Sequence, residues 1–161
     1  MGSDARMRVH RAGASEAGVV RNIFEEYYDA IGVLVRDDPT QFAAYFEDGS
    51  GVWLASAGCE VAGCVALRPI ATRPAACEVK RLYVRPAHRG AGIATALMDE
   101  LEAYAARHAF RYVYLDTKDD LETAIRFYRQ RGYETCERYN DNPQATVFMR
   151  YRIPSPARAD T

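Results

Sequence analysis

The stretch CEVKRLYVRPAHRGAGIATALM, residues 77–98, joins a predicted strand to a predicted helix through a loop that contains two glycines. The strand ends in the apolar residues Leu82–Val84. Glycine destabilises a helix, so Gly90 and Gly92 at the start of the helix need an explanation. The helix is expected to run from residue 93 to about residue 108, because its apolar residues recur at helical spacing: Ile93, Ala96, Leu97, Leu101, Tyr104 and Ala105.

The loop RGAGIA, residues 89–94, has the features of an anion-binding site. The first N–H groups of a helix have no partner within it, and the helix dipole adds partial positive charge there. Glycine at positions 90 and 92 leaves room for close approach, and Arg89 adds a formal charge. The sequence therefore predicts a phosphate group at this loop, with Arg89 either contacting it or only capping the loop.

Two nucleotide-binding motifs resemble this loop without matching it. A P-loop requires a lysine after its last glycine, and no lysine follows Gly92. A dinucleotide-binding fingerprint requires a third glycine, where this chain has Thr95, although Asp116 lies near the place of a ribose-binding acid. The loop is also too long for a tight turn, so a dinucleotide site is a minor alternative.

The remaining pattern predicts an α/β fold with a mixed central sheet and helices on both faces. Helices are expected from a cap at Ser15, from Pro39 to Phe46, and from a cap at Asp119 or Asp120 to Gly132 as the C′ residue. We expect one domain over residues 1–161, with a core of about 7–153 and a frayed tail. The predicted strands are MRVHRA (7–12), GVWLASAG (51–58), EVAGCVALRPI (60–70), CEVKRLYV (77–84), RYVYLDT (111–117), YETCERY (133–139) and ATVFMRYRI (145–153).

The composition of the chain argues against several classes of function. The formal net charge of −1 argues against nucleic acid or an anionic membrane as a partner. No apolar run approaches the ~20 residues of a membrane span, and no signal-peptide centre is present, so a cytoplasmic protein with reduced, buried thiols is expected. The four cysteines and three histidines lack zinc-ligand spacing, so no metal site is predicted. Residues 20–50 contain seven acids and two arginines, which form either solvated helix faces or an acidic rim for a cationic substrate.

The loop at Arg89, Gly92 and Ala94 resembles the (Arg/Gln)-x-x-Gly-x-(Gly/Ala) motif of the GCN5-related N-acetyltransferases, the GNAT family. The segments CEVKRLYVRPAHRGAGIATALM and AIRFYRQRGY are typical of the family, and CEVKRLYV, YLDT and YNDNP resemble a bacterial group of small members with mostly unassigned substrates. The resemblance implies six to seven strands, a splayed parallel strand pair and a site for acetyl-CoA. Backbone groups of Leu82 and Val84 would contact pantetheine, and the pyrophosphate would be bound by backbone N–H groups of Arg89, Gly90, Ala91, Gly92, Ile93 and Ala94.

The implied reaction needs a group that accepts a proton and a group that donates one. A primary amine with a pKa near ~10.4 is mostly protonated at neutral pH and must lose a proton before attack. Glu78, eleven residues before Arg89, is the candidate base, with pairing to Lys80 or an ordered water as alternatives. Tyr128 is the candidate acid, matching the family tyrosine directed at the CoA sulfur, with a hydrogen-bonded core tyrosine as the alternative. Many members have asparagine where this chain has Leu121, which removes one pantetheine contact.

The sequence says less about the residues that bind the acceptor than about those that bind the cofactor. The resemblance places it near the first two helices and the turn between the last strands, which indicates Tyr27, Tyr139 and Asn140 as substrate-binding residues. Aromatic and carboxylate groups suit a small amine or a peptide amine. Because no motif places a cysteine for an acyl-enzyme, we expect direct attack in a ternary complex. A non-catalytic CoA-binding sensor or interaction module is the alternative. The family resemblance also implies that a homodimer could form through a terminal strand.

Overall fold

The structure, a computed structural model, describes residues 6–155. A seven-stranded sheet runs through it in the order β1-β2-β3-β4-β5-β7-β6. The predicted frayed tail falls almost entirely on residues 156–161, which lie outside the described residues. The strands are β1 (Met7–Arg11), β2 (Gly51–Ala57), β3 (Glu60–Pro69), β4 (Ala76–Val84), β5 (Tyr112–Thr117), β6 (Glu134–Thr135) and β7 (Val147–Arg152). The helices are α1 (Ala17–Ile31), α2 (Pro39–Ala44), α3 (Ile93–Arg107) and α4 (Glu122–Gln130), with 3-10 turns at Ala14–Glu16 and Pro86–His88.

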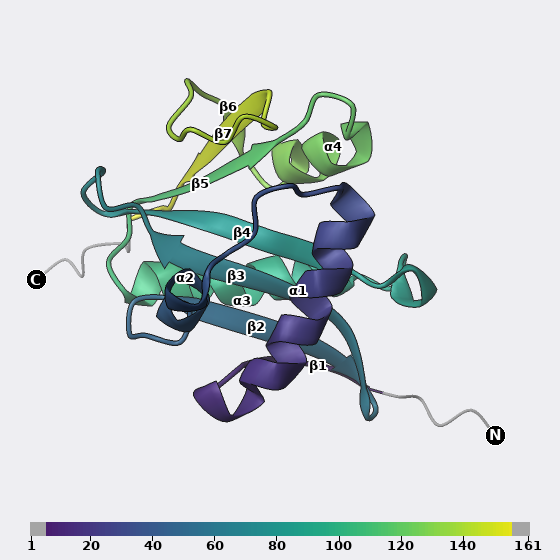
Figure 1. Cartoon of the computed structure of the whole chain (residues 1–161). Helices are drawn as coiled ribbons and strands as arrows, with labels where there is room; N and C mark the ends of the chain where they lie inside the picture. The colour runs from purple at the N-terminus through teal and green to yellow at the C-terminus, as the bar shows by residue number, and fades with distance from the viewer. Residues whose placement is uncertain (1–5, 156–161) are drawn as a thin grey trace, which may run out of the picture.

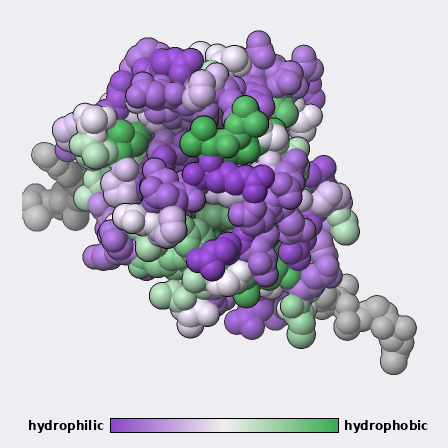
Figure 2. All heavy atoms as spheres, in the orientation of Figure 1, coloured by the Kyte–Doolittle hydropathy of each residue, from purple (hydrophilic) through white to green (hydrophobic). Residues whose placement is uncertain are grey.

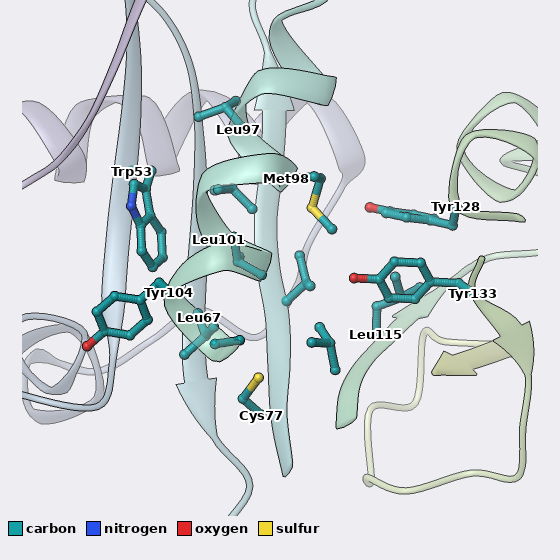
Figure 3. Close-up of a cluster of buried hydrophobic side chains, with 14 of the residues drawn as sticks. Trp53, Leu67, Cys77, Leu97, Met98, Leu101, Tyr104, Leu115, Tyr128 and Tyr133 are labelled. Atoms are coloured by element: carbon teal, nitrogen blue, oxygen red, sulfur yellow. The ribbon is translucent and has the colours of Figure 1, made fainter. Parts of the chain in front are cut away.

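The sheet separates two hydrophobic clusters, so the predicted mixed sheet with helices on both faces is confirmed. One cluster packs α1 and α2 against the sheet, in front of it in Figure 1, and we call this side the α1 face. The other packs α3 and α4 against the opposite side, which we call the α3 face. Figure 3 shows the α3 cluster, where Leu97, Met98 and Leu101 meet Leu67 and Leu115 from the sheet. Burial of this apolar surface stabilises the layered arrangement.

The predicted splay between two parallel strands is confirmed. β4 and β5 pair only over Ala76–Glu78 and Tyr112–Tyr114, while β5 pairs with β7 along its whole length. Beyond this short contact β5 diverges from β4 (Figure 1). The later half of β4 therefore has backbone groups that no strand on the β5 side occupies.

A β-bulge lies in β4 beside the splay. Cys64 of β3 opposes Tyr83, but Ala66 opposes Lys80, so one residue of β3 faces two residues of β4. The extra residue is accommodated at Arg81, whose φ is 60°, in the left-handed region that non-glycine residues rarely adopt. As a result, the alternation of side chains between the two faces of the sheet shifts by one residue at this point.

The bulge determines which side chains of β4 lie on each face. Cys77 and Val79 belong to the α3 cluster before it, and Leu82 and Val84 pack on the same cluster after it. Tyr83 belongs to the α1 cluster. Arg81 also lies toward α1, where it pairs with Asp37.

Two predicted helix caps are wrong. α1 begins at Ala17 after a 3-10 turn, and Ser15 lies within this turn instead of capping the helix. The turn forms because the Glu16 carboxylate turns back to accept from the N–H of Gly13 and from His10.

The start of α4 also differs from its prediction, whereas its end agrees. Leu121 is the N-cap residue, without a side-chain hydrogen bond, so neither predicted aspartate caps the helix. The Asp119 N–H donates to the Thr146 hydroxyl at 2.8 Å, and this bond fixes the preceding loop to the segment before β7. Gly132, with φ of 98°, follows the C-cap Arg131 and is the predicted C′ residue.

The strand predicted over residues 133–139 is wrong for most of its length. Only Glu134 and Thr135 form β6, and the chain then leaves the sheet. The Arg138 guanidinium donates to the carbonyls of Asn140, Asn142 and Ala145, which holds residues 138–145 in a compact loop. This loop, residues 138–145, brings polar side chains over the splayed part of the sheet.

Candidate functional site

A cavity of about 640 Å³ lies at the splay between β4 and β5. Its lining includes Tyr27 from α1 and Asn140 from the 138–145 loop, both on the α1 side of the sheet. It also includes Leu82 and Tyr128, which belong to the α3 side. The cavity thus connects the two faces through the gap between the strands.

The glycine loop at the start of α3 presents free backbone donors. Gly90 and Gly92 have φ of 84° and 78°, and a Cβ placed on either would meet no protein atom within 4 Å. Within residues 6–155, the N–H groups of Gly90, Ala91 and Gly92 have no backbone acceptor. The N–H groups of Ile93 and Ala94 follow in the first turn of α3. This arrangement fits an anionic phosphate, because the protein leaves both the donors and the space above them open.

Arg89 adopts the capping role that the sequence left open. Its Nε donates to the carbonyl of Val84 at 3.2 Å, which closes the end of β4. The guanidinium remains exposed beside the loop, so the same residue still adds positive charge there. Residues 89–94 do not line the cavity itself, and the loop lies beyond the end of β4.

Glu78 is buried and fully engaged by neighbouring donors. It is 6% exposed, and its Oε1 accepts from Arg68 Nε at 2.6 Å. Its Oε2 accepts from the Tyr139 hydroxyl at 2.9 Å and lies 3.6 Å from Lys80 Nζ. The predicted alternative partner, Lys80, is therefore present, but Arg68 is the closer cation. Glu78 and Tyr139 lie beside the cavity without lining it.

A second carboxylate, Asp116, lies on the cavity wall. Its Oδ2 accepts from Asn140 Nδ2 at 2.5 Å and is 3.4 Å from Lys80 Nζ, and its Oδ1 accepts from Asn142 at 3.3 Å. Lys80 therefore joins Glu78 to Asp116 in one charged network on the α1 face. The network links β4, β5 and the 138–145 loop on the α1 side of the cavity.

Tyr128 lies on the cavity wall from the opposite face. It is 8% exposed, and its hydroxyl points away from α4, toward the side where Met98 lies (Figure 3). No described residue forms a hydrogen bond with this hydroxyl, so it is not the hydrogen-bonded core tyrosine of the alternative prediction. Burial raises the pKa of Tyr128 above the ~10 of a free phenol, so the hydroxyl keeps its proton at neutral pH.

Burial likewise raises the pKa of Tyr139, with the Glu78 carboxylate adding to the effect. Burial also raises the pKa of Tyr27, against the opposing charge of Arg81. Both phenols therefore stay neutral near pH 7. Tyr27 is half-buried and its ring lies 6.3 Å from that of Tyr83, on the α1 side of the cavity.

Sequence reasoning missed two arginines at this site. Arg81 Nη2 donates to Asp37 at 3.0 Å, and its guanidinium lies 4.9 Å from the Tyr28 ring, which fixes the α1–α2 segment over the bulge. Arg68 holds Glu78 across the β3–β4 pair. Both contacts depend on strand register, which the spacing of residues within one strand does not reveal.

The four cysteines differ in their exposure. Cys64 and Cys77 are buried as expected, but Cys59 is exposed and Cys136 is half-buried. No cysteine lines the cavity. Between residues 6 and 155, no group of three His, Cys, Asp or Glu side chains is arranged to hold a metal ion. No helix in the same range is long and apolar enough to cross a membrane.

Comparisons with known proteins agree with this architecture. The model of the acetyltransferase (GNAT) family matches residues 19–133. A solved GNAT-family acetyltransferase from Staphylococcus aureus superimposes with a TM-score of 0.80 at 17% identity, covering 92% of this chain and 100% of that chain. An acetyltransferase from Salmonella typhimurium, solved with its cofactor acetyl-CoA, has a TM-score of 0.72 at 18% identity and covers 96% and 98%.

Curated relatives carry N-acetyltransferase names. An uncharacterized N-acetyltransferase from Schizosaccharomyces pombe is 42% identical over 92 residues, which is 56% of this chain and 56% of that protein. Mouse N-acetyltransferase 8 is 35% identical over 89 residues, 53% of this chain and 39% of that protein. The chain thus spans about half the length of the yeast relative and less of the mouse one. YjgM of Escherichia coli, an uncharacterized N-acetyltransferase, is 29% identical over 123 residues, 73% and 74% of the two chains.

Proposed function

Because this chain belongs to the GNAT family of acetyltransferases, we propose that it is an acetyl-CoA-dependent N-acetyltransferase acting on a primary amine. The observation that carries the proposal is the cavity through the splayed sheet, with Tyr128 on one face and Asp116 and Asn140 on the other. This arrangement favours direct attack in a ternary complex, since each reactant has its own side of the sheet.

The residues toward the donor fit a CoA group. Backbone N–H groups from Gly90 to Ala94 would hold the pyrophosphate, since the described chain leaves those of residues 90–92 without acceptors, whereas the predicted Arg89 N–H already donates to the Pro86 carbonyl at 3.4 Å. Leu82 and Val84 would offer backbone groups to pantetheine, because β5 has already diverged from β4 there. When bound, acetyl-CoA supplies a thioester whose carbonyl carbon the amine attacks, with release of the CoA thiol.

Tyr128 is proposed to hold the proton that the leaving thiol needs. Its raised pKa keeps the hydroxyl protonated, and its lack of a partner leaves that proton available to a group in the cavity. A departing thiol has a pKa near ~8.5, so a hydrogen bond from Tyr128 is enough to stabilise the developing thiolate.

Glu78 is proposed to receive the proton lost by the acceptor amine. Because both of its oxygens are already hydrogen-bonded, the open route runs through the Tyr139 hydroxyl, which donates to Oε2. That hydroxyl would pass its proton to Glu78 as it accepts one from the side of the cavity. Tyr27 and Asn140 would then line the path of the acceptor from the α1 face.

The proposal is tested by measuring thiol release from acetyl-CoA with a panel of amines, alongside thermal shifts with CoA and acetyl-CoA. An N-acetyltransferase gives amine-dependent thiol release and is stabilised by both cofactor forms. Stabilisation without thiol release for any amine would favour a CoA-binding sensor or interaction module. The absence of both would defeat acetyl-CoA as the ligand.

A further inference from the structure

We infer that the acceptor is an amine that also carries a carboxylate, and that Arg68 binds this carboxylate. The inference rests on the proposed acetyl transfer and concerns the acceptor at the same site. It starts from the position of Arg68 on the cavity wall, on the α1 face of β3. Its side chain is 35% exposed, whereas the Glu78 side chain beneath it is 7% exposed.

Arg68 uses only part of its hydrogen-bonding capacity within the protein. Nε donates to Glu78, and neither Nη group forms a hydrogen bond with a described residue. The ion pair fixes the orientation of the guanidinium, so its outer edge is held ready for a ligand. A guanidinium edge with free donors matches the geometry of a carboxylate.

The other cavity cations are buried, paired at both ends or outside the Glu78 network. Lys80 lies between Glu78 and Asp116. Arg81 pairs with Asp37 and keeps an unpartnered Nε, but its side chain is only 11% exposed. Arg36 directs its two Nη groups to Glu25 and Asp29. Lys118 also lines the cavity, but it follows the end of β5 and forms no ion pair with Glu78 or Asp116. Among the described residues, Arg68 is therefore the cation of the Glu78 network that combines an exposed side chain with free Nη donors.

Charge balance favours a ligand that carries both signs. Arg68 and Lys80 contribute two positive charges to the network, and Glu78 and Asp116 contribute two negative charges. A simple ammonium or a simple carboxylate would add an uncompensated charge to this half-buried site. An amino acid enters as a zwitterion, with its carboxylate toward Arg68 and its amine toward the splay.

The cofactor phosphates do not compete for Arg68. The glycine loop follows Val84, which lies roughly 20 Å along the strand from Glu78 at about 3.3 Å per residue. The loop also leads into α3 on the opposite face of the sheet. The free edge of Arg68 is thus available to the acceptor while the pyrophosphate is bound.

The test compares α-amino acids with their own carboxamides, which keep the amine and lose the carboxylate charge. Thiol release from acetyl-CoA is measured for the wild type, Arg68→Gln and Arg68→Lys, with Arg36→Gln as the matched control. We expect kcat/KM for the preferred acid to exceed that of its carboxamide by about 10- to 100-fold. Arg68→Gln should abolish this ratio, Arg68→Lys should lower it at least about threefold because lysine lacks the planar fork, and Arg36→Gln should preserve it.

Equal rates for acids and carboxamides, or an unchanged ratio in Arg68→Gln, would overturn the inference. If Arg68→Gln fails to fold, Arg68→Lys decides, since a ratio within about twofold of the wild type has the same meaning. Acetylation of amines without a carboxylate alone also overturns the inference but leaves the proposed acetyl transfer intact. Failure of the proposed acetyl transfer gives a different result, because acetyl-CoA would then neither bind nor release thiol with any amine.

Discussion

Replacing Tyr128 with phenylalanine removes one oxygen from the cavity wall and little else. The hydroxyl forms no hydrogen bond with the described residues, so its removal leaves no partner unsatisfied. The ring remains packed near Tyr133, whose centroid is 5.7 Å away. We therefore expect the free energy of unfolding to change by less than about 0.5 kcal/mol. A change in turnover can then be attributed to the lost proton donor.

The size of the turnover change follows from the leaving group. General acid catalysis contributes ~10²- to 10⁴-fold, and the lower end applies here because a thiol with a pKa near ~8.5 leaves without full protonation. Tyr128→Phe should thus lower kcat about 100-fold, or about 2.7 kcal/mol in activation free energy. Because burial raises the pKa of Tyr128 above ~10, its proton is present below that pH, so the defect should be similar from about pH 6 to 9.

The assay is stopped-flow detection of released thiol, with acetyl-CoA affinity measured separately by calorimetry. Tyr133→Phe is the control, because that hydroxyl donates to Glu102 Oε2 at 2.9 Å and lies in the core. The control should lose about 1–2 kcal/mol of stability and keep its kcat. A kcat for Tyr128→Phe within about threefold of the wild type, or an equal loss of acetyl-CoA affinity, would refute the assignment of Tyr128 as proton donor.

Three other changes have distinct expected results. Glu78→Gln should lower kcat for amine-dependent thiol release, because the amide cannot accept the proton passed on by Tyr139, and an unchanged rate would exclude Glu78 as the proton acceptor. Gly63→Ala should cost about 1–3 kcal/mol of stability by denaturant unfolding, because its Cβ would lie 2.7 Å from the Tyr83 carbonyl oxygen; a stability within about 0.5 kcal/mol of the wild type would contradict this close approach. Arg81→Met should leave the Asp37 carboxylate buried without its cation and cost about 3 kcal/mol in thermal unfolding, and an unaltered Tm would show that this pair does not anchor the α1–α2 segment.

The parts of the fold that follow from local patterns were predictable from the sequence. The α3 helix and its glycine loop were predicted because apolar spacing and glycine position are local signals, and the structure places this helix at Ile93–Arg107. Met98 was not assigned to its apolar face, although it is fully buried. It lies next to Leu97 on a face wider than the predicted stripe.

The site depends on contacts that local patterns do not contain. Glu78 and Tyr139 are 61 residues apart and meet because the 138–145 loop leaves the sheet, where the sequence predicted a continuing strand. Arg68 reaches Glu78 through the β3–β4 register, which a bulge shifts by one residue. The sequence suggested Asp116 only as a ribose-binding acid. Its partners Asn140 and Lys80 come from other elements, so its place in the charged network was not predicted.

The three acceptor residues predicted from the family resemblance do not all line the cavity. Tyr27 and Asn140 line it, whereas Tyr139 lies behind it as a donor to Glu78. Figure 2 shows that the surface on this side is mostly hydrophilic with separate hydrophobic patches. Exposed Leu34 and Val35 follow α1 there, a feature that the charge count of this region did not reveal.

The bulge at Arg81 makes β4 unusually sensitive to a change in length. The strand consists of two halves whose side-chain alternation is out of phase by one residue. Deleting Arg81 would restore simple alternation with Leu82 and Val84 still toward α3, and would cost the ion pair with Asp37. Inserting one residue after Arg81 would instead turn Leu82 and Val84 away from α3 and leave a void beneath the helix. An insertion at this position should therefore be less tolerated than most substitutions in the strand. For β4, the number of residues matters as much as their identity.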